Sequence, residues 1–120
     1  MWEVEYTNEF EDWWDTLSEA EQINVASVVG LLEENGANLK FPYSSGIQGS
    51  KHSHMRELRV QHCGRPYRVL YVFDPRRCAI LLIGGNKTGE KHWYEKYIPK
   101  ADILYDRHLV ELKNEGLLNE

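Results

Sequence analysis

Residues 67–84, YRVLYVFDPRRCAILLIG, decide the fold of this 120-residue chain. Residues 67–73 combine β-branched, aromatic and leucine side chains, a composition typical of a strand. Residues 74–77, DPRR, place proline at the second position of a four-residue turn, where it is favoured. Residues 78–84 form a continuous apolar run, which indicates a strand covered by helices on both faces. The stretch therefore predicts an antiparallel hairpin inside a helix-covered sheet.

The segments on either side of this hairpin extend the sheet. Residues 55–60, MRELRV, predict a neighbouring strand that a turn at residues 63–66 joins to the hairpin. Residues 2–6, WEVEY, alternate apolar and charged side chains, which is the pattern of a half-buried strand. Residues 37–54 contain Pro42 and several glycine and serine residues, so we expect a loop there.

Three helices complete the prediction. Thr7-Asn8 can cap a first helix, and residues 18–21, SEAE, form a capping box for a second helix that ends at residues 35–36, NG. A third helix is expected beyond Pro99, because proline suits the first turn of a helix. The order β-α-α-β-β-β-α predicts an α+β fold, a small, mainly antiparallel sheet packed with helices, in a single domain over residues 1–120.

Composition places the chain in the globular class, with 42% hydrophobic and 28% charged residues. No apolar run approaches the roughly 20 residues that span a bilayer. The N-terminus lacks the basic start and apolar stretch of a signal peptide. We therefore expect a soluble, cytoplasmic protein without a membrane partner.

The net charge of −5 hides a strong segregation of charge along the chain. Residues 1–50 carry a balance of −9, residues 51–100 carry +7, and residues 101–120 carry −3. A phosphate senses charge within a Debye length of about 8–10 Å, so the basic middle can bind nucleic acid despite the acidic total. The alternative is that acidic helices neutralise a basic sheet.

Hairpin geometry predicts that cations gather at one end of the sheet. If Phe73 pairs with Cys78 across the turn, then Arg68 faces Ile83, and the residues after the last strand lie near the same end. The prediction depends on register, because a shift of one residue moves side chains to the opposite face. The cations expected at this end are Arg59, Arg65, Arg68 and Lys87, followed in the chain by Lys91.

Such a cluster suits RNA cleavage in which a ribose 2′-hydroxyl attacks the adjacent phosphorus. This reaction needs a base, cations for the charge on the phosphate, and an acid for the departing 5′ oxygen. Aromatic side chains can stack on an unpaired base. The candidate proton carriers are His54, His92 and Tyr94; the candidate stacking surfaces are Tyr67, Trp93 and Tyr97; Arg56 is a further phosphate-binding candidate.

Several of these residues have a structural alternative. Tyr67 alternates with other aromatic residues on one strand face, which favours the core, and Trp93 can anchor the last helix. Arg68 lies inside an otherwise apolar strand and requires an anion, for which Glu57 on the neighbouring strand is the structural candidate. The spacing of histidines around His54 matches no established zinc pattern, so we expect no metal or cofactor.

These residues also resemble a known family. Residues 55–59 (MRELR), 67–71 (YRVLY) and 85–87 (GNK), with Trp93 followed by Pro99, resemble the phage-derived branch of the HigB/RelE toxin superfamily over roughly residues 54–105. The resemblance implies the toxin of a type II toxin–antitoxin pair. Such toxins cleave translated mRNA in the ribosomal A site without metal and are silenced by an antitoxin, often of helix-turn-helix type.

The resemblance also assigns roles. Arg68 corresponds to the phosphate-stabilising strand arginine of the family, Lys87 to a cation after the last strand, and Tyr94 to a C-terminal tyrosine. His92 corresponds to a histidine of HigB members. Met55 and Glu57 depart from the RelE branch, which has lysines there, so Arg56, Arg59 or a histidine must supply the base.

Two other functions fit the same pattern. A non-catalytic inhibitor, like the gyrase-poisoning ParE branch of the superfamily, would bind a protein and need no acid or base. An RNA- or ribosome-binding module without cleavage would show salt-sensitive binding and leave RNA intact.

Overall fold

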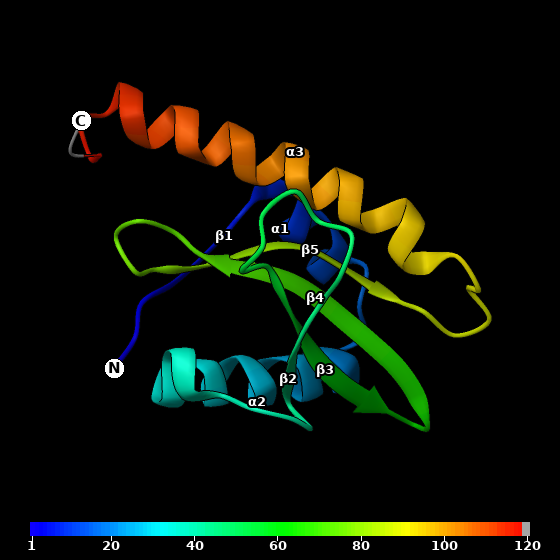
Figure 1. Cartoon of the computed structure of the whole chain (residues 1–120). Helices are drawn as coiled ribbons and strands as arrows, with labels where there is room; N and C mark the ends of the chain where they lie inside the picture. Colours follow the sequence, from blue (N-terminus) through cyan, green and yellow to red (C-terminus); the bar gives the residue numbers. More distant parts are fainter. Residues whose placement is uncertain (119–120) are drawn as a thin grey trace.

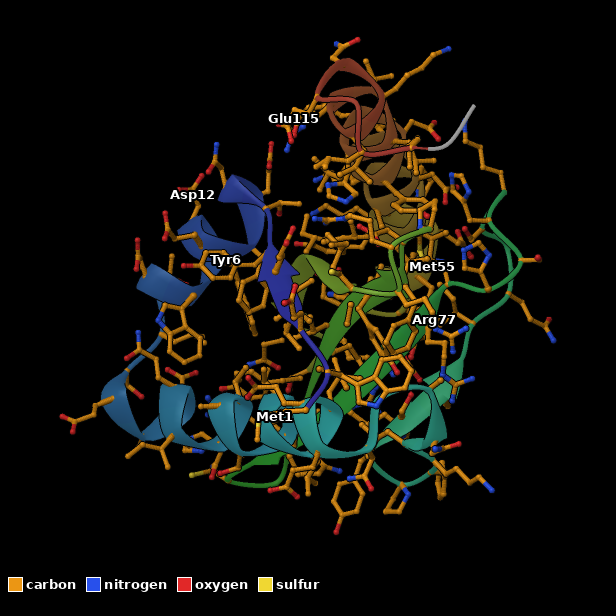
Figure 2. All side chains as sticks on the ribbon, turned by 90° about the vertical axis from the view of Figure 1, so that its left-hand side faces the viewer. Met1, Tyr6, Asp12, Met55, Arg77 and Glu115 are labelled. Atoms are coloured by element: carbon orange, nitrogen blue, oxygen red, sulfur yellow. The ribbon has the colours of Figure 1, made fainter. Side chains whose placement is uncertain are left out.

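The computed structural model describes residues 1–118, which form a five-stranded sheet between helices. The strand order is β1-β5-β4-β3-β2; α3 crosses one face of the sheet and α2 the other (Figure 1). Figure 2 shows the sheet between these two helices, with side chains filling both layers. The elements are β1 (Val4–Tyr6), α1 (Asn8–Asp15), α2 (Glu19–Asn35), a 3-10 turn (Gly36–Asn38), β2 (Ser44–Gly46), β3 (Arg56–His62), β4 (Arg65–Phe73), β5 (Ala79–Asn86) and α3 (Trp93–Asn114).

The predicted α+β fold is confirmed, with one strand added. Neighbouring pairs among β2, β3, β4 and β5 are antiparallel, whereas β1 pairs in parallel with β5. The expectation of an unbroken loop over residues 37–54 is wrong, because β2 lies within it and pairs Ser44 with Leu58. The sequence SSG has no strand preference of its own; the open edge of β3 supplies the backbone partners.

The predicted helix caps are present. The Thr7 hydroxyl accepts a hydrogen bond from the Phe10 N–H at 3.0 Å. Ser18 and Glu21 form the reciprocal capping box that begins α2. Gly36 ends that helix with a φ of 56°, a conformation that glycine adopts at little cost.

Helix α3 begins earlier than expected. It starts at Trp93, so Pro99 lies in its second turn and not at its start. Trp93 and Ile98 are both buried against the sheet. Burial of these side chains, at about 25 cal/mol per Å² of apolar surface, offsets the backbone hydrogen bond that proline removes. Among the described residues, none of the helices combines the length and the apolar character needed to cross a bilayer.

The register between β4 and β5 differs from the expected one. Phe73 pairs with Ala79, and a bulge beside Leu70 and Tyr71 shifts the remaining pairs further. Arg68 therefore faces Gly85, and the expected pairing with Ile83 is wrong. The register differs for two reasons. The turn is longer than the pattern indicated, because the Asp74 N–H donates to the carbonyl of Cys78. The bulge then adds one residue to β5.

Candidate functional site

A buried carboxylate, Glu57 on β3, lies at the centre of a polar cluster on the α3 face of the sheet. Its side chain is 5% exposed. The Tyr94 hydroxyl donates to Oε1 at 2.6 Å, and the Ser45 hydroxyl donates to Oε2 at 2.6 Å. Arg59 Nη1 also reaches Oε2 at 3.1 Å. A charged group at this depth is stable only with such partners, and Glu57 has several.

Arg68 lies beside this carboxylate on the neighbouring strand. Its Nε is 3.6 Å from Glu57 Oε1, close enough for an ion pair but too long for a hydrogen bond. Nη1 donates to the carbonyl of Tyr67 at 3.0 Å. Within residues 1–118, no group accepts a hydrogen bond from the buried Nε. The Arg68 guanidinium therefore keeps a donor that a ligand oxygen could satisfy.

The shifted register brings Lys87 to the same place. Its backbone N–H donates to the Pro66 carbonyl at 2.9 Å, which extends the hairpin ladder by one residue beyond β5. Its ammonium lies 5.0 Å from the centre of the Tyr94 ring. Arg68 faces Gly85, which has no side chain, so the space beside the guanidinium is left to groups from α3 and the loop before it. We call Glu57, Arg59, Arg68, Lys87 and Tyr94 the Glu57 cluster.

The environment of the cluster shifts the pKa values of two of its members, Lys87 and Tyr94. Burial, and then the approach of Arg68, lower the pKa of Lys87, although Glu57 opposes the change. Burial and the hydrogen bond to Glu57 raise the pKa of Tyr94, so its hydroxyl stays protonated near neutral pH. Three cations, Arg59, Arg68 and Lys87, surround the single carboxylate of Glu57. The cluster is thus net positive, as RNA binding requires.

The structure brings together part of the predicted site. Of the ten candidate residues, Arg59, Arg68, Lys87 and Tyr94 lie in the Glu57 cluster. The other six lie elsewhere: two arginines are on the opposite face of the sheet, three residues are in loops, and the tryptophan is buried against the sheet. The residues outside the cluster are His54, Arg56, Arg65, Lys91, His92 and Trp93.

The strand arginines outside the cluster lie on the α2 face. Arg56 donates to the Ser44 hydroxyl at 3.0 Å, next to Tyr71 in that core. Arg65 shares the end of the sheet with the cluster, but it has the same parity on β4 as Tyr67 and so lies on the other face. Arg65 therefore lies at the expected end of the sheet but on the face opposite Arg68.

Neither candidate histidine contacts the cluster in the described part of the chain. His54 lies in the loop against α3, with its ring 6.2 Å from Tyr105, about 16 Å along the helix from Tyr94. His92 is exposed just before α3 and approaches Glu95 at 3.3 Å. Lys91 is exposed in the same loop. Among the described residues, the Glu57 cluster therefore contains no histidine.

The aromatic candidates divide between core and surface. Tyr67 is 1% exposed and belongs to the core under α2, the position that its alternation with the other aromatic residues of the strand predicts. Trp93 is also 1% exposed and anchors α3; a Cβ on Gly85 would lie 2.7 Å from its indole nitrogen. Tyr97 stacks on Trp93 with ring centres 4.6 Å apart and is half-buried. Of the three, Tyr97 is the least buried, but the ammonium groups of Lys96 and Lys100 lie 5.6 and 5.0 Å from its ring centre.

The sequence indicated Glu57 as an ion partner of Arg68 and as a departure from the RelE branch, but not as a candidate site residue. In the structure its carboxylate accepts hydrogen bonds from Arg59 and Tyr94 and lies 3.6 Å from Arg68 Nε. The signal was present in the sequence: a glutamate at an inward position of a strand adjoining the arginine. The sequence does not indicate Ser45, because it lies in β2, a segment whose composition predicts a loop.

A separate group at the opposite end of the sheet could in principle hold a metal ion. Glu3, Glu5 and Cys78 bring one ligand atom each within 4.8 Å of the others. Glu5 is already paired with Arg76 at 2.8 Å, and burial raises the pKa of the Cys78 thiol. A nearby guanidinium and a protonated thiol disfavour a cation, so this group ties β1 to the β4–β5 turn.

Known proteins resemble this chain in sequence or in fold. Residues 12–106 match the family described as phage derived protein Gp49-like (DUF891). The chain is 39% identical to the putative toxin HigB3 of Mycobacterium tuberculosis over 107 residues, 88% of this chain and 92% of that protein. It is 39% identical to the putative toxin HigB2 of the same organism over 92 residues, 75% of this chain. The chain spans about half of HigB2, 46% of its length.

Two solved structures share the fold at low sequence identity. The archaeal RelE–RelB complex from Pyrococcus horikoshii OT3 matches with a TM-score of 0.52 and 14% identity over 72% of this chain and 94% of that chain. A double arginine mutant of the E. coli toxin RelE in the free state matches with a TM-score of 0.57 and 9% identity over 78% and 92%. The chain therefore belongs to the phage-derived Gp49-like family, within the HigB/RelE group of toxins.

Proposed function

We propose that this chain is the toxin of a type II toxin–antitoxin pair and acts in the cytoplasm as a ribosome-dependent, metal-independent endoribonuclease on translated mRNA. The observation that carries this proposal is the Glu57 cluster, in which three cations, a carboxylate and a tyrosine hydroxyl meet on one face of the sheet. Relatives named as toxins support the toxin role, and the RelE–RelB complex supports an antitoxin partner. The proposed antitoxin is of helix-turn-helix type.

The cluster contains the groups that the proposed reaction needs. Glu57 accepts the proton of the ribose 2′-hydroxyl, whose oxygen bonds to the adjacent phosphorus. Arg68 and Arg59 stabilise the charge on the phosphate oxygens. The bond from phosphorus to the 5′ oxygen breaks, and the Lys87 ammonium supplies a proton to that oxygen. The products are a 2′,3′-cyclic phosphate and a free 5′-hydroxyl.

Access to the cluster requires Tyr94 to move. The Arg59 side chain is 28% exposed, whereas that of Arg68 is only 6% exposed. A phosphate therefore meets Arg59 and Lys87 first. When the Tyr94 hydroxyl leaves Glu57, the carboxylate is free to act as a base and the unpaired Nε of Arg68 can bind a phosphate oxygen.

Induced expression with mapping of transcript ends tests the proposed function. The toxin should arrest growth and leave mRNAs cut within translated regions, and cleavage should cease when ribosomes are removed from a purified reaction. DNA damage with intact transcripts would favour the gyrase-poisoning alternative instead. Intact transcripts with salt-sensitive ribosome binding would indicate a module without chemistry.

Lys87→Met should lower the single-turnover cleavage rate by about 10²-fold or more, because it removes the proton donor. The parent rate should fall as pH rises through the lowered pKa of Lys87, since only the ammonium form donates a proton. The fall should begin below the ordinary range of lysine and should disappear in Lys87→Arg, whose side chain stays charged. Lys51→Met, at an exposed lysine paired with Asp106, is the control. A pH profile identical in the parent and Lys87→Arg contradicts the role.

A further inference from the structure

The loop before β2 exposes a large aromatic side chain. Phe41 is 70% exposed, among the highest values for a large apolar residue in the described chain. Single exposed apolar residues are common and need no explanation by themselves. Phe41, however, lies against Arg59, a member of the Glu57 cluster, which suggests a role in binding the substrate.

Arg59 connects the ring to the cluster. Its guanidinium carbon lies 5.0 Å from the centre of the Phe41 ring, while Nη1 contacts Glu57 at 3.1 Å. Arg59 is also near enough to Lys87 to lower the pKa of that lysine. The aromatic face and the cations that would bind a phosphate are therefore adjacent.

Hydrogen bonds hold the loop that carries this ring. The Arg59 backbone N–H donates to the Tyr43 carbonyl at 2.8 Å. The N–H groups of Tyr43 and Ser44 donate to the Lys40 carbonyl at 3.0 and 3.1 Å. The buried Ser44 hydroxyl bonds to Tyr71 OH at 2.6 Å. The segment that carries Phe41 is thus hydrogen-bonded to both β3, through Arg59, and β4, through Tyr71.

We propose that Phe41, backed by Arg59, is a nucleobase-binding platform that stacks on an unpaired base of the substrate RNA beside the scissile phosphate. An aromatic ring next to an arginine offers a stacking surface and a cation at once. Because every base has a π face, the platform would bind without strict sequence preference. This inference rests on the proposed ribonuclease activity and adds the group that positions its substrate.

Cleavage of ribosome-bound mRNA by Phe41 variants tests the platform. Purified ribosomes carrying a defined mRNA codon in the A site are mixed with excess toxin, and the single-turnover rate is measured against toxin concentration. Phe41→Ala and Phe41→Leu should both lower the second-order rate constant by about 5- to 150-fold. Phe41→Trp should restore it, because the π face returns. Leucine separates stacking from simple apolar contact.

An abasic nucleotide provides the second arm of the test. Removing the stacked base from the A-site codon should slow the parent to the level of Phe41→Ala and should slow Phe41→Ala no further. A merely structural role of Phe41 would make the two losses additive. Tyr6→Ala is the matched control: Tyr6 is 58% exposed on β1, at the other edge of the sheet, and should cleave like the parent (Figure 2).

The outcomes separate this inference from the function on which it rests. If the parent cleaves and Phe41→Leu or Phe41→Ala cleaves equally well, the platform is refuted and the ribonuclease stands. If Phe41→Ala cleaves normally but escapes neutralisation by the antitoxin, the ring is a protein contact and the platform is equally refuted. If the parent cuts no ribosome-bound mRNA, the proposed function fails and the inference with it.

Discussion

Replacing Arg68 with lysine should relieve growth arrest and lower the rate of mRNA cleavage by about 10²–10³-fold, the usual cost of one lost transition-state donor. The chain should stay folded, because lysine keeps a positive charge beside Glu57. A lysine ammonium lacks the planar fork with which arginine binds two phosphate oxygens at once. The loss should thus appear in the chemical step and not in the amount of protein.

The measurement combines growth under induced expression, mapping of transcript ends, and thermal unfolding of the purified variant. Arg76→Lys is the matched control, since Arg76 is also an ion-paired arginine, held by Asp74 at 2.7 Å and Glu5 at the opposite end of the sheet. The control should retain cleavage even if it unfolds at a somewhat lower temperature. Parent-level cleavage by Arg68→Lys would remove this residue from the site.

Glu57→Gln should reduce both stability and activity. It leaves the Arg68 guanidinium, in a side chain only 6% exposed, without its anion. Breaking a buried ion pair by removing one partner costs about 3–5 kcal/mol, so the free energy of unfolding should fall by that amount. Cleavage should fall by about 10²-fold or more, because an amide cannot accept the 2′-hydroxyl proton. Urea unfolding and single-turnover cleavage measure the two effects.

A double variant separates these two roles of Glu57. Glu57→Gln with Arg68→Met removes both buried charges, and stability should return to within about 1–2 kcal/mol of the parent, since replacing a whole pair is often nearly neutral. Cleavage should stay absent. Glu9→Gln breaks the exposed pair with Arg107 and should cost no more than about 1 kcal/mol. A stable but fully active Glu57→Gln variant is incompatible with the proposed base.

Patterns within single segments, such as the alternation of side chains in strands and the helix caps, predicted much of the fold. The strand composition of residues 67–73, the apolar run after it, the capping box at Ser18 and the glycine after α2 all have the predicted structure. The parity of β4 also placed Tyr67 in the core and Arg68 on the opposite face. These features are local, because they depend on neighbours a few residues away in the chain.

The candidate site was predictable only in part. Hairpin geometry placed Arg68 and Lys87 at one end of the sheet, and they lie in the Glu57 cluster with Tyr94, but His54, Arg65 and His92 lie outside it. Glu57 was seen in the sequence as a departure from the RelE branch, whereas its contacts make it the central residue of the site. Residue type alone did not reveal this, because a buried carboxylate acquires its role from the groups that surround it.

The sequence by itself determined that β3, β4 and β5 are consecutive strands and which side chains of β4 share a face, but it did not indicate β2 or the partner of β1. Only the tertiary structure decided where Arg68 and Lys87 meet, since that depends on the longer turn at Asp74 and on the bulge opposite Leu70 and Tyr71. It also decided that Trp93 is buried and begins α3 early. The reason is that register and burial follow from packing between segments distant in the chain, which no short pattern encodes.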